Sequence, residues 1–364
     1  MWQYEKLLLP VAAGNRVSLG EGNTPLVRSR AIGPALGLKN LYFKLESLNP
    51  SGSYKDRFAS AFISQMKSKN QGLCIATSSG NTGAALSAYS AAAGIRCVLV
   101  IVDGAPVPKI RQMQLYGAHT IMVEGFGKDA SVTSEVFDQL NKLAGSFGVP
   151  LPVSAFMYCS DGMQGVQSLM YELMEAIPVD HVFSPAGGGG LTLAMAYGAN
   201  KYADHYNRSK KPKVNCVQPE GNDTIASALR NGDTSGTIIA KATTKISGLQ
   251  VPNILDGNEV IRECRMLGGN GYVVSDESVF ELQKKLAQSE GIFSEPAGAV
   301  ALAGLVKAVG AGEVGEDDHI VCLVTGSGFK DMLSVENNFN LPDIGMISPA
   351  EVSNSIREIN IKHP

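Results

Sequence analysis

Short, continuous apolar segments alternate with helix-like segments along most of this chain. Residues 97–102 (Cys-Val-Leu-Val-Ile-Val) and 320–324 (Ile-Val-Cys-Leu-Val) are of the apolar kind. A strand that is apolar on both faces has to be covered on both faces, and a parallel sheet between two layers of helices meets this need. The sequence therefore predicts an α/β fold with mostly parallel sheets.

The chain of 364 residues is longer than one core usually supports, so two lobes around one site are expected. A first series of elements closes with a helix at 128–146, and a second starts near Val153. Residues beyond about Pro349 are predicted as a helix or a frayed tail. The expected strands are 41–46, 74–76, 97–102, 120–123, 180–183, 214–217 and 320–324, and the expected helices are 55–66, 84–92, 108–117, 128–146, 163–177, one after Gly190, 276–289 and 297–310.

Composition argues against several classes of partner. The chain is 44% hydrophobic and 18% charged, with a formal net charge of −3. The chain has no surplus of basic residues of the kind that would indicate binding to nucleic acid. No stretch reaches the ~20 apolar residues of a membrane span, and Leu7-Leu8-Leu9 is too short for the core of a signal sequence. We therefore expect neither nucleic acid nor membrane as a partner.

The cysteines have no CxxC pair and no histidine at ligand spacing, so no metal site is expected. Most of them lie in apolar runs, which favours buried free thiols and a reducing, cytoplasmic location. They are Cys74, Cys97, Cys159, Cys216, Cys264 and Cys322.

One lysine is distinguished by its surroundings. Residues 49–57 (Asn-Pro-Ser-Gly-Ser-Tyr-Lys-Asp-Arg) predict a tight turn and a helix start, with Ser51 or Ser53 as the cap. Lys55 then falls in the first helical turn, whose partial positive charge favours the neutral amine. A neutral amine can form a Schiff base. A solvated surface lysine is the alternative interpretation.

Two strand-to-helix corners consist of small residues with free backbone amides. They are residues 76–83 (Ala-Thr-Ser-Ser-Gly-Asn-Thr-Gly) and 184–192 (Ser-Pro-Ala-Gly-Gly-Gly-Gly-Leu-Thr). Free amides at a helix start favour an anion, and consecutive glycines are typical of a close approach to phosphate. An ordinary turn is the alternative for the first corner. A nucleotide site is the alternative for the second, although the G-x-G-x-x-G pattern is absent.

The lysine motif resembles that of the fold-type II pyridoxal-phosphate enzymes, and most closely the N-P-[TS]-G-S-[FY]-K-D-R form of the threonine synthase group. Residues 20–27 resemble the G-E-G-x-T-P-L signature of this group, and matching segments continue to residue 331. The resemblance implies two open, twisted, mostly parallel αβα lobes with the cofactor in the cleft between them, and a homodimer. The implied parts are an N-terminal lobe at 52–155, a C-terminal lobe at 1–51 and 156–350, and a tail at 351–364.

The resemblance also implies roles for single residues. Lys55 would hold pyridoxal 5′-phosphate as a Schiff base and move the protons of a small amino-acid substrate. Asn81 would bond the cofactor's 3′ oxygen. The substrate carboxylate would bind at Ser78, Ser79, Gly80, Asn81 and Thr82, and the cofactor phosphate at Gly187, Gly188, Gly189, Gly190 and Leu191.

A third glycine-rich turn, residues 325–331 (Thr-Gly-Ser-Gly-Phe-Lys-Asp), follows the last apolar strand. By resemblance to T-G-x-G-x-K-D, the hydroxyl of Thr325 would face the pyridine nitrogen, with Ser327 as the second candidate. A hydroxyl leaves that nitrogen largely unprotonated, which favours elimination and replacement over transamination. A plain turn is the alternative. Residues 294–299 resemble a corner that packs on the cofactor, which would place Glu295 near the ring.

The resemblance fails at the segment that grips the substrate phosphate in threonine synthases. The group has N-P-x-R-x-x-G-Q-K-T there, whereas residues 154–165 of this chain lack the arginine. A phosphate without a bidentate cation loses its strongest contact. Four residues could supply a cation from elsewhere: Lys44, Arg57, Lys109 and Arg111.

Three reactions therefore remain open. They are the conversion of O-phosphohomoserine to threonine, the dehydration of serine or threonine with release of ammonia, and β-replacement of the cysteine or cysteate synthase type. All begin with removal of the Cα proton by Lys55. A non-catalytic binding or regulatory module is a further alternative, against which the presence of Lys55, Asn81 and Thr325 argues.

Overall fold

The computed structural model describes residues 1–105, 107–341 and 344–362. The chain forms two compact units, Met1–Asp331 and Met332–Pro364. The second unit contains α12 (Met332–Asn338), a 3-10 turn at Pro349–Glu351 and α13 (Val352–Lys362). A helix or a frayed tail was expected beyond about Pro349, and the structure has the helix α13 there. All elements discussed below belong to the first unit.

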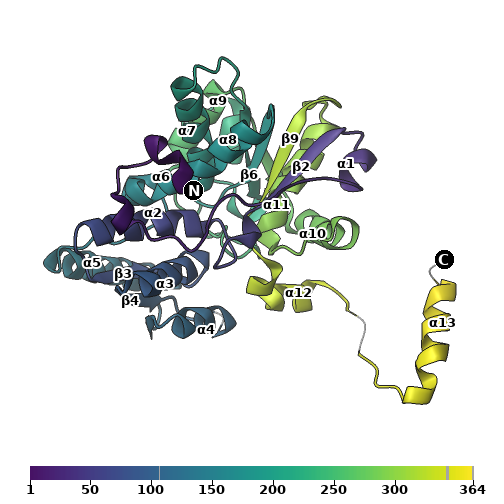
Figure 1. Cartoon of the computed structure of the whole chain (residues 1–364), viewed down its shortest axis with the longest axis horizontal. Coiled ribbons are helices and arrows are strands. Elements are labelled where there is room, and N and C mark those ends of the chain that lie inside the picture. The colour runs from purple at the N-terminus through teal and green to yellow at the C-terminus, as the bar shows by residue number, and fades with distance from the viewer. Residues whose placement is uncertain (106, 342–343, 363–364) are drawn as a thin grey trace. The chain divides into compact units, whose positions relative to one another are not determined.

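The larger sheet has six strands in the order β1-β2-β9-β6-β7-β8. β1 pairs antiparallel with β2, and the other neighbours are parallel. Strands from the first fifty residues thus lie beside β9 from the end of the unit (Figure 1). The bounds are β1 Leu26–Arg28, β2 Asn40–Leu45, β6 His181–Pro185, β7 Lys213–Pro219, β8 Gly271–Val274 and β9 His319–Val324.

Successive residues of this sheet face two different helix layers. Val182 and Val321, which are partners in register, share a hydrophobic cluster with residues of α7 and α9. The next pair, Phe183 and Cys322, lies in a second cluster with residues of α10 and α11. Helices therefore cover both faces (Figure 1), as continuous apolar strands predict. These helices are α7 Gly190–His205, α9 Gly257–Met266, α10 Asp276–Glu290 and α11 Pro296–Gly310.

The smaller sheet contains the parallel strands β3 (Leu73–Thr77), β4 (Arg96–Ile101) and β5 (His119–Met122). A row of helices connects the two sheets, because α3 contacts α2, α2 contacts α6 and α6 contacts α7. The predicted α/β fold with mostly parallel sheets is confirmed. The remaining helices are α1 Ile32–Ala35, α2 Lys55–Ser68, α3 Asn81–Ala93, α4 Val107–Leu115, α5 Ala130–Ser146, α6 Phe156–Ala176 and α8 Ala226–Asn231.

Some elements predicted from the sequence differ from those in the structure. α6 begins at Phe156 instead of near residue 163, because its first turn is kinked at Cys159 (φ −146°, ψ 69°) and exposes Met157, which hides the helical period. The short strand β8 and the helices α8 and α9 were not predicted. For β8 and α9 the reason is that glycines interrupt the pattern between residues 257 and 271.

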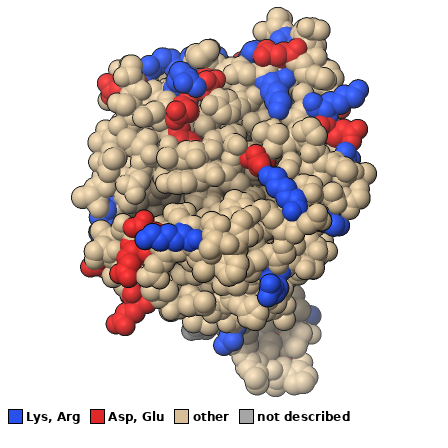
Figure 2. All heavy atoms as spheres, turned by 90° about the vertical axis from the view of Figure 1, so that its left-hand side faces the viewer, with Lys and Arg blue, Asp and Glu red and all other residues tan. Residues whose placement is uncertain are grey.

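All six cysteines are buried and free, as expected. No helix in the described part of the chain is long and apolar enough to cross a membrane. On the face shown in Figure 2, charges of both signs are interspersed with wide uncharged areas.

Candidate active site

Lys55 is the first residue of α2, and its amine contacts a serine from another part of the chain. Lys55 Nζ lies 2.6 Å from Ser154 Oγ, which lies 3.2 Å from Thr82 Oγ1. The amine is also 4.6 Å from the centre of the Tyr54 ring, a cation–π distance. The lysine is half-buried rather than extended into solvent.

The turn before α2 is held by its own side chains. Gly52 has a φ of +92°, where glycine is favoured, and its amide bonds Asn49 O at 2.8 Å. The predicted serine cap is wrong, since Tyr54 is the N-cap and makes no side-chain cap bond to the described chain. Instead the carboxylate of Asp56 accepts bonds from the amide of Ser51, at 2.6 Å, and from its hydroxyl. Burial raises the pKa of Asp56 to about 7.

Two further segments join this turn at the end of β9. The amide of Tyr54 donates to Thr325 O at 3.0 Å, and the amide of Glu295 donates to Gly326 O at 3.0 Å. Residue 326 has to be glycine, because a Cβ there would lie 2.1 Å from Glu295 Oε1. The structure thus brings the lysine turn, the 325–331 turn and the 294–299 corner together.

Unpartnered hydroxyls gather at this junction. Within residues 1–105, 107–341 and 344–362, the buried hydroxyls without a hydrogen-bond partner are those of Thr325, Ser53 and Ser294, which lie here, and that of Ser90 in α3. Ser53 pairs with Gly326 through the backbone, and Ser294 pairs with Ser327 in the same way. Buried hydroxyls are normally satisfied, so this group indicates a place where a ligand supplies the partners.

The first anion corner follows β3. Gly80 is the N-cap of α3, and Ser78 Oγ accepts a bond from the amide of Gly83 at 3.0 Å. Residue 83 has to be glycine, since a Cβ would lie 2.4 Å from Ser78 O. Among the described residues, no partner is found for the amides of Ser79, Asn81 and Thr82. These amides are available to an anion.

Asn81 links the first corner to the 294–299 segment. Its side-chain amide donates to both carboxylate oxygens of Glu295, at 2.9 and 3.1 Å. Glu295 is buried, and burial raises its pKa. Asn81, predicted to bond the cofactor, therefore has a protein acceptor in this structure.

The second anion corner follows β6. Gly189 has a φ of +95°, and a Cβ on Gly190 would lie 2.9 Å from Ser154 O. Both positions therefore require glycine. The amides of residues 187–192 have no partner in the part of the chain described. Since β3, β6 and β9 end at Thr77, Pro185 and Val324, each corner lies at a strand's carboxyl end, where open α/β sheets bind ligands.

Asp256 connects the second corner to Ser154. Its carboxylate accepts bonds from the amides of Phe156 and Met157, at 2.7 and 3.0 Å, and so caps α6. Its own amide donates to Gly188 O at 3.0 Å. Burial raises the pKa of Asp256.

A buried ion-pair network lies behind the lysine. Arg57 donates to Glu46 through Nε and Nη2, both at 2.8 Å, and to Glu172 through Nη1 and Nη2, at 2.7 and 2.8 Å. Lys44 Nζ lies 2.7 Å from Glu172. Burial alone would raise the pKa of Glu172, but Arg57 and Lys44 outweigh it and lower the pKa to about 2.

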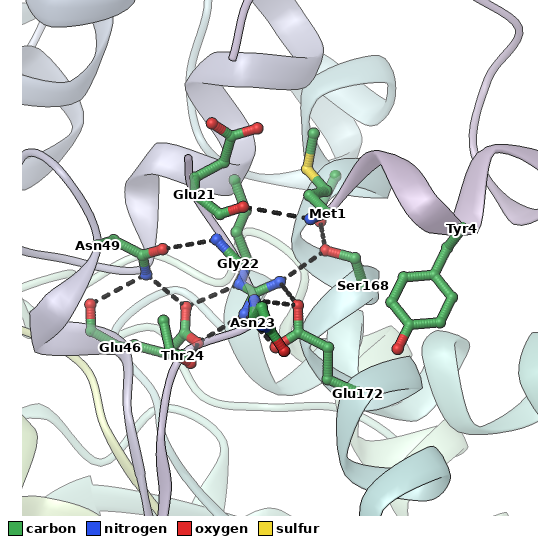
Figure 3. Close-up of polar contacts among 12 residues, drawn as sticks. Met1, Tyr4, Glu21, Gly22, Asn23, Thr24, Glu46, Asn49, Ser168 and Glu172 are labelled. Atoms are coloured by element: carbon green, nitrogen blue, oxygen red, sulfur yellow. Dashed lines mark hydrogen bonds and ion pairs between the residues drawn. The ribbon is translucent and has the colours of Figure 1, made fainter. Parts of the chain in front are cut away.

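The 20–27 motif belongs to this network and not to the lysine's surroundings. Thr24 Oγ1 donates to Glu46 at 2.6 Å, and the amide of Asn23 donates to Glu172 at 2.8 Å. Figure 3 shows these residues around the two carboxylates. The motif therefore helps to hold the two carboxylates that bind Arg57 in the first turn of α2.

The site's polar groups fit pyridoxal 5′-phosphate. Free amides at residues 187–191 suit its phosphate. The amine of Lys55 suits its aldehyde. The unpartnered hydroxyl of Thr325 would be satisfied by the ring nitrogen.

Two residues of the site were missed in the sequence. Ser154 meets Lys55 across 99 positions, and no local pattern predicts such a contact. Asp256 is the N-cap residue of α9, a position that the sequence could have indicated, but its carboxylate caps α6 instead. The pairing of Arg57 likewise depends on residues from two other segments, Glu46 in one and Ser168 and Glu172 of α6 in the other.

Comparison with known proteins gives consistent matches. The family described as pyridoxal-phosphate dependent enzyme matches residues 17–326. The threonine synthase of Methanocaldococcus jannaschii is 31% identical over 332 residues, covering 91% of this chain and 80% of the relative. That of a Bacillus species is 30% identical over 348 residues, covering 94% and 91%.

A solved structure shows the same fold. The processed form of threonine deaminase isoform 2 from Solanum lycopersicum superposes with a TM-score of 0.72 at 20% identity, covering 93% of this chain and 87% of that one. The fold, the cofactor and the resemblance to threonine synthase predicted from the motifs are confirmed. The chain therefore belongs to the pyridoxal-phosphate dependent enzyme family and is threonine synthase-like.

Proposed function

We propose that this enzyme eliminates or replaces a group on the side chain of a small amino acid, with Lys55 as the base. One observation carries the proposal: Lys55 Nζ lies among two corners of free amides and buried hydroxyls without partners. Such a place binds a phosphate and a carboxylate on either side of a nucleophilic amine.

Each residue has a defined task in this proposal. The bound cofactor withdraws electrons from the Cα of the amino acid. Amides of residues 78–82 bind the substrate carboxylate, and amides of residues 187–191 bind the cofactor phosphate. Lys55 Nζ takes the Cα proton. The uncharged hydroxyl of Thr325 faces the ring nitrogen and favours elimination and replacement.

The first candidate reaction is the formation of threonine from O-phosphohomoserine. Threonine synthases are the curated relatives reported above, and the lysine motif is most similar to theirs. This reaction requires a cation for the phosphate of the substrate.

The second candidate is a serine or threonine dehydratase, and the engagement of the cations favours it. Lys44 and Arg57 are tied into the buried network. Lys109 Nζ lies 3.2 Å from Asp331, and Arg111 is exposed, beside Gln114, with 3.4 Å between Nη1 and Oε1. A β-replacement synthase is the third alternative and shares the first half of the reaction.

The test follows the visible spectrum of the purified protein as L-threonine, L-serine, O-phosphoserine and O-phosphohomoserine are added separately. Each mixture is assayed for phosphate, ammonia and 2-oxo acid. Phosphate and threonine from O-phosphohomoserine would establish the first candidate, and ammonia with 2-oxo acid the second. Colour that fades only on addition of a nucleophile would indicate replacement. A protein without a borohydride-sensitive band would overturn the proposal.

The proposal includes the organisation of the molecule. We expect lobes at 52–155 and at 1–51 with 156–350, a homodimer, and a cytoplasmic location. The lobes are supported by the two separate sheets, the location by six free thiols, and the dimer by the family resemblance. Light scattering tests the dimer, and fractionation of cells tests the location.

A further inference from the structure

Ser154 supplies a hydroxyl directly at the reacting amine. Its Oγ lies 2.6 Å from Lys55 Nζ and 3.2 Å from Thr82 Oγ1. Ser154 and Thr82 are half-buried, and Thr82 belongs to the corner proposed for the substrate carboxylate. Two hydroxyls thus lie between the amine and the place of the substrate.

Ser154 is held by contacts that also shape the phosphate corner. The amide of Ala155 bonds Val153 O at 2.8 Å, which makes a tight turn centred on Ser154. Gly190 packs so closely that a Cβ would lie 2.9 Å from Ser154 O. Asp256 binds the amide of Phe156 directly beyond. This hydroxyl is therefore positioned by the fold and does not depend on a flexible loop.

The group that these hydroxyls can bind is uncharged. Of the cations near the site, Lys44, Arg57 and Lys109 are paired with carboxylates and Arg111 is exposed. Lys330 is half-buried and is held by Ser51 O and Gln112 Oε1, both at 2.8 Å. A hydroxyl group is satisfied by neutral donors and acceptors, whereas the phosphate ester of a substrate has its strongest contact with a bidentate cation.

We infer that Ser154, assisted by Thr82, binds the side-chain oxygen of the substrate and selects a β-hydroxy amino acid over a phosphate ester. The inference rests on the proposed function and specifies its substrate class. Ser154 is then a catalytic residue, because it touches both the reacting amine and the leaving oxygen.

The geometry also gives the hydroxyl a path for a proton. Lys55 Nζ takes the proton as the Cα–H bond breaks. The Cβ–O bond then breaks with its electron pair on oxygen, which receives the Ser154 Oγ proton and leaves as water. Ser154 Oγ recovers a proton from Lys55 Nζ, so serine and amine both return to their starting states.

The test compares Ser154→Ala with Ser160→Ala, an exposed serine in α6, the helix that follows Ser154. For the first variant we expect kcat/KM with L-serine and L-threonine to fall by about 10²-fold, the lower end of proton-transfer effects. The Kd of L-alanine, read from the shift of the visible band, should change less than about 2-fold. L-alanine has no side-chain oxygen, so it does not make the hydrogen bond that the substitution removes. Ser160→Ala should match the wild type, and Ser154→Thr should recover part of the activity.

Other outcomes would overturn the inference. A wild type that prefers O-phosphohomoserine would show that Ser154 does not select a hydroxyl. The same would follow if Ser154→Ala weakened the binding of L-alanine as much as that of L-threonine. If no amino acid shifts the spectrum of the wild type, the proposed function itself fails. Should Ser154→Ala not fold, Thr82→Val replaces it, and unchanged turnover of L-threonine with Thr82→Val would contradict the inference.

Discussion

Lys55 and Arg57 are separated by one residue on α2, yet their surroundings differ in how completely polar groups are paired. All three guanidinium nitrogens of Arg57 donate to carboxylates or to Ser168. Near Lys55, by contrast, buried hydroxyls such as that of Thr325 and the amides of two helix starts have no partner in the described chain.

The difference separates a structural region from a binding region. An unsatisfied buried polar group costs about 1–3 kcal/mol, so several of them together are retained only where a ligand satisfies them. A complete network gains nothing from a ligand and holds the helix in place. The two regions should therefore respond to mutation in different measurements.

The largest effect is expected for Lys55→Ala. Turnover should fall by at least about 10³-fold, since the variant loses the base, while the free energy of unfolding stays nearly unchanged. The variant should still bind pyridoxal phosphate but lack the borohydride-sensitive band. Steady-state assays and absorption spectra check this, and retained turnover would refute the role of Lys55.

Glu172→Ala, in contrast to Lys55→Ala, should lower the free energy of unfolding. Removing one partner of a buried ion pair costs about 3–5 kcal/mol, and here it leaves Arg57 and Lys44 with fewer partners. Urea unfolding measures the loss. The control is Glu281→Ala, an exposed glutamate of α10, which should change stability by no more than about 0.5 kcal/mol. Equal stability of the two variants would mean that the network is dispensable.

Two carboxylates should give opposite pH responses. The lowered pKa of Glu172, about 2, means that its stabilising contribution is present above the ordinary value of 4.5 and is lost as pH falls toward 2. The raised pKa of Asp56, about 7, means that its contribution is complete below 3.8 and is lost as pH rises toward 7.

Urea unfolding between pH 3 and 8 checks the opposite pH responses of Glu172 and Asp56. Relative to the wild type, Asp56→Asn should gain stability as pH rises from about 4 to about 7. The deficit of Glu172→Gln should shrink as pH falls below about 4. Parallel pH profiles for both variants would contradict the assignment of opposite shifts.

The smallest effect is expected for Thr325→Val. Because its hydroxyl has no partner among the described residues, the free energy of unfolding should change little, while the affinity for pyridoxal phosphate falls about 2- to 10-fold, the value of one hydrogen bond. The matched control is Thr192→Val, whose buried hydroxyl bonds Ser184 Oγ at 3.0 Å. That variant should lose about 1–3 kcal/mol of stability. A reversed pattern would remove the distinction between the two regions.

Local features were predictable from the sequence. The turn before Lys55 and the glycines at residues 187–190 depend on backbone conformations that only a few residue types adopt, and those residues are visible in order. Contacts between distant segments were not. Asp256, for example, caps a helix 100 positions away. In the sequence Arg57 looks like any surface charge until its partners from the turn after β2 and from α6 are placed.

The pairing of β2 with β9 has a consequence for folding. Lys44 lies opposite Leu323 in register, so a strand made early during synthesis waits for one made near the end of the unit. Non-local pairing of this kind slows folding. The amide of Tyr54 also bonds Thr325 O only after β9 is in place. Nascent chains that end before residue 319 should therefore fail to retain the cofactor, and its capture should report completion of the fold.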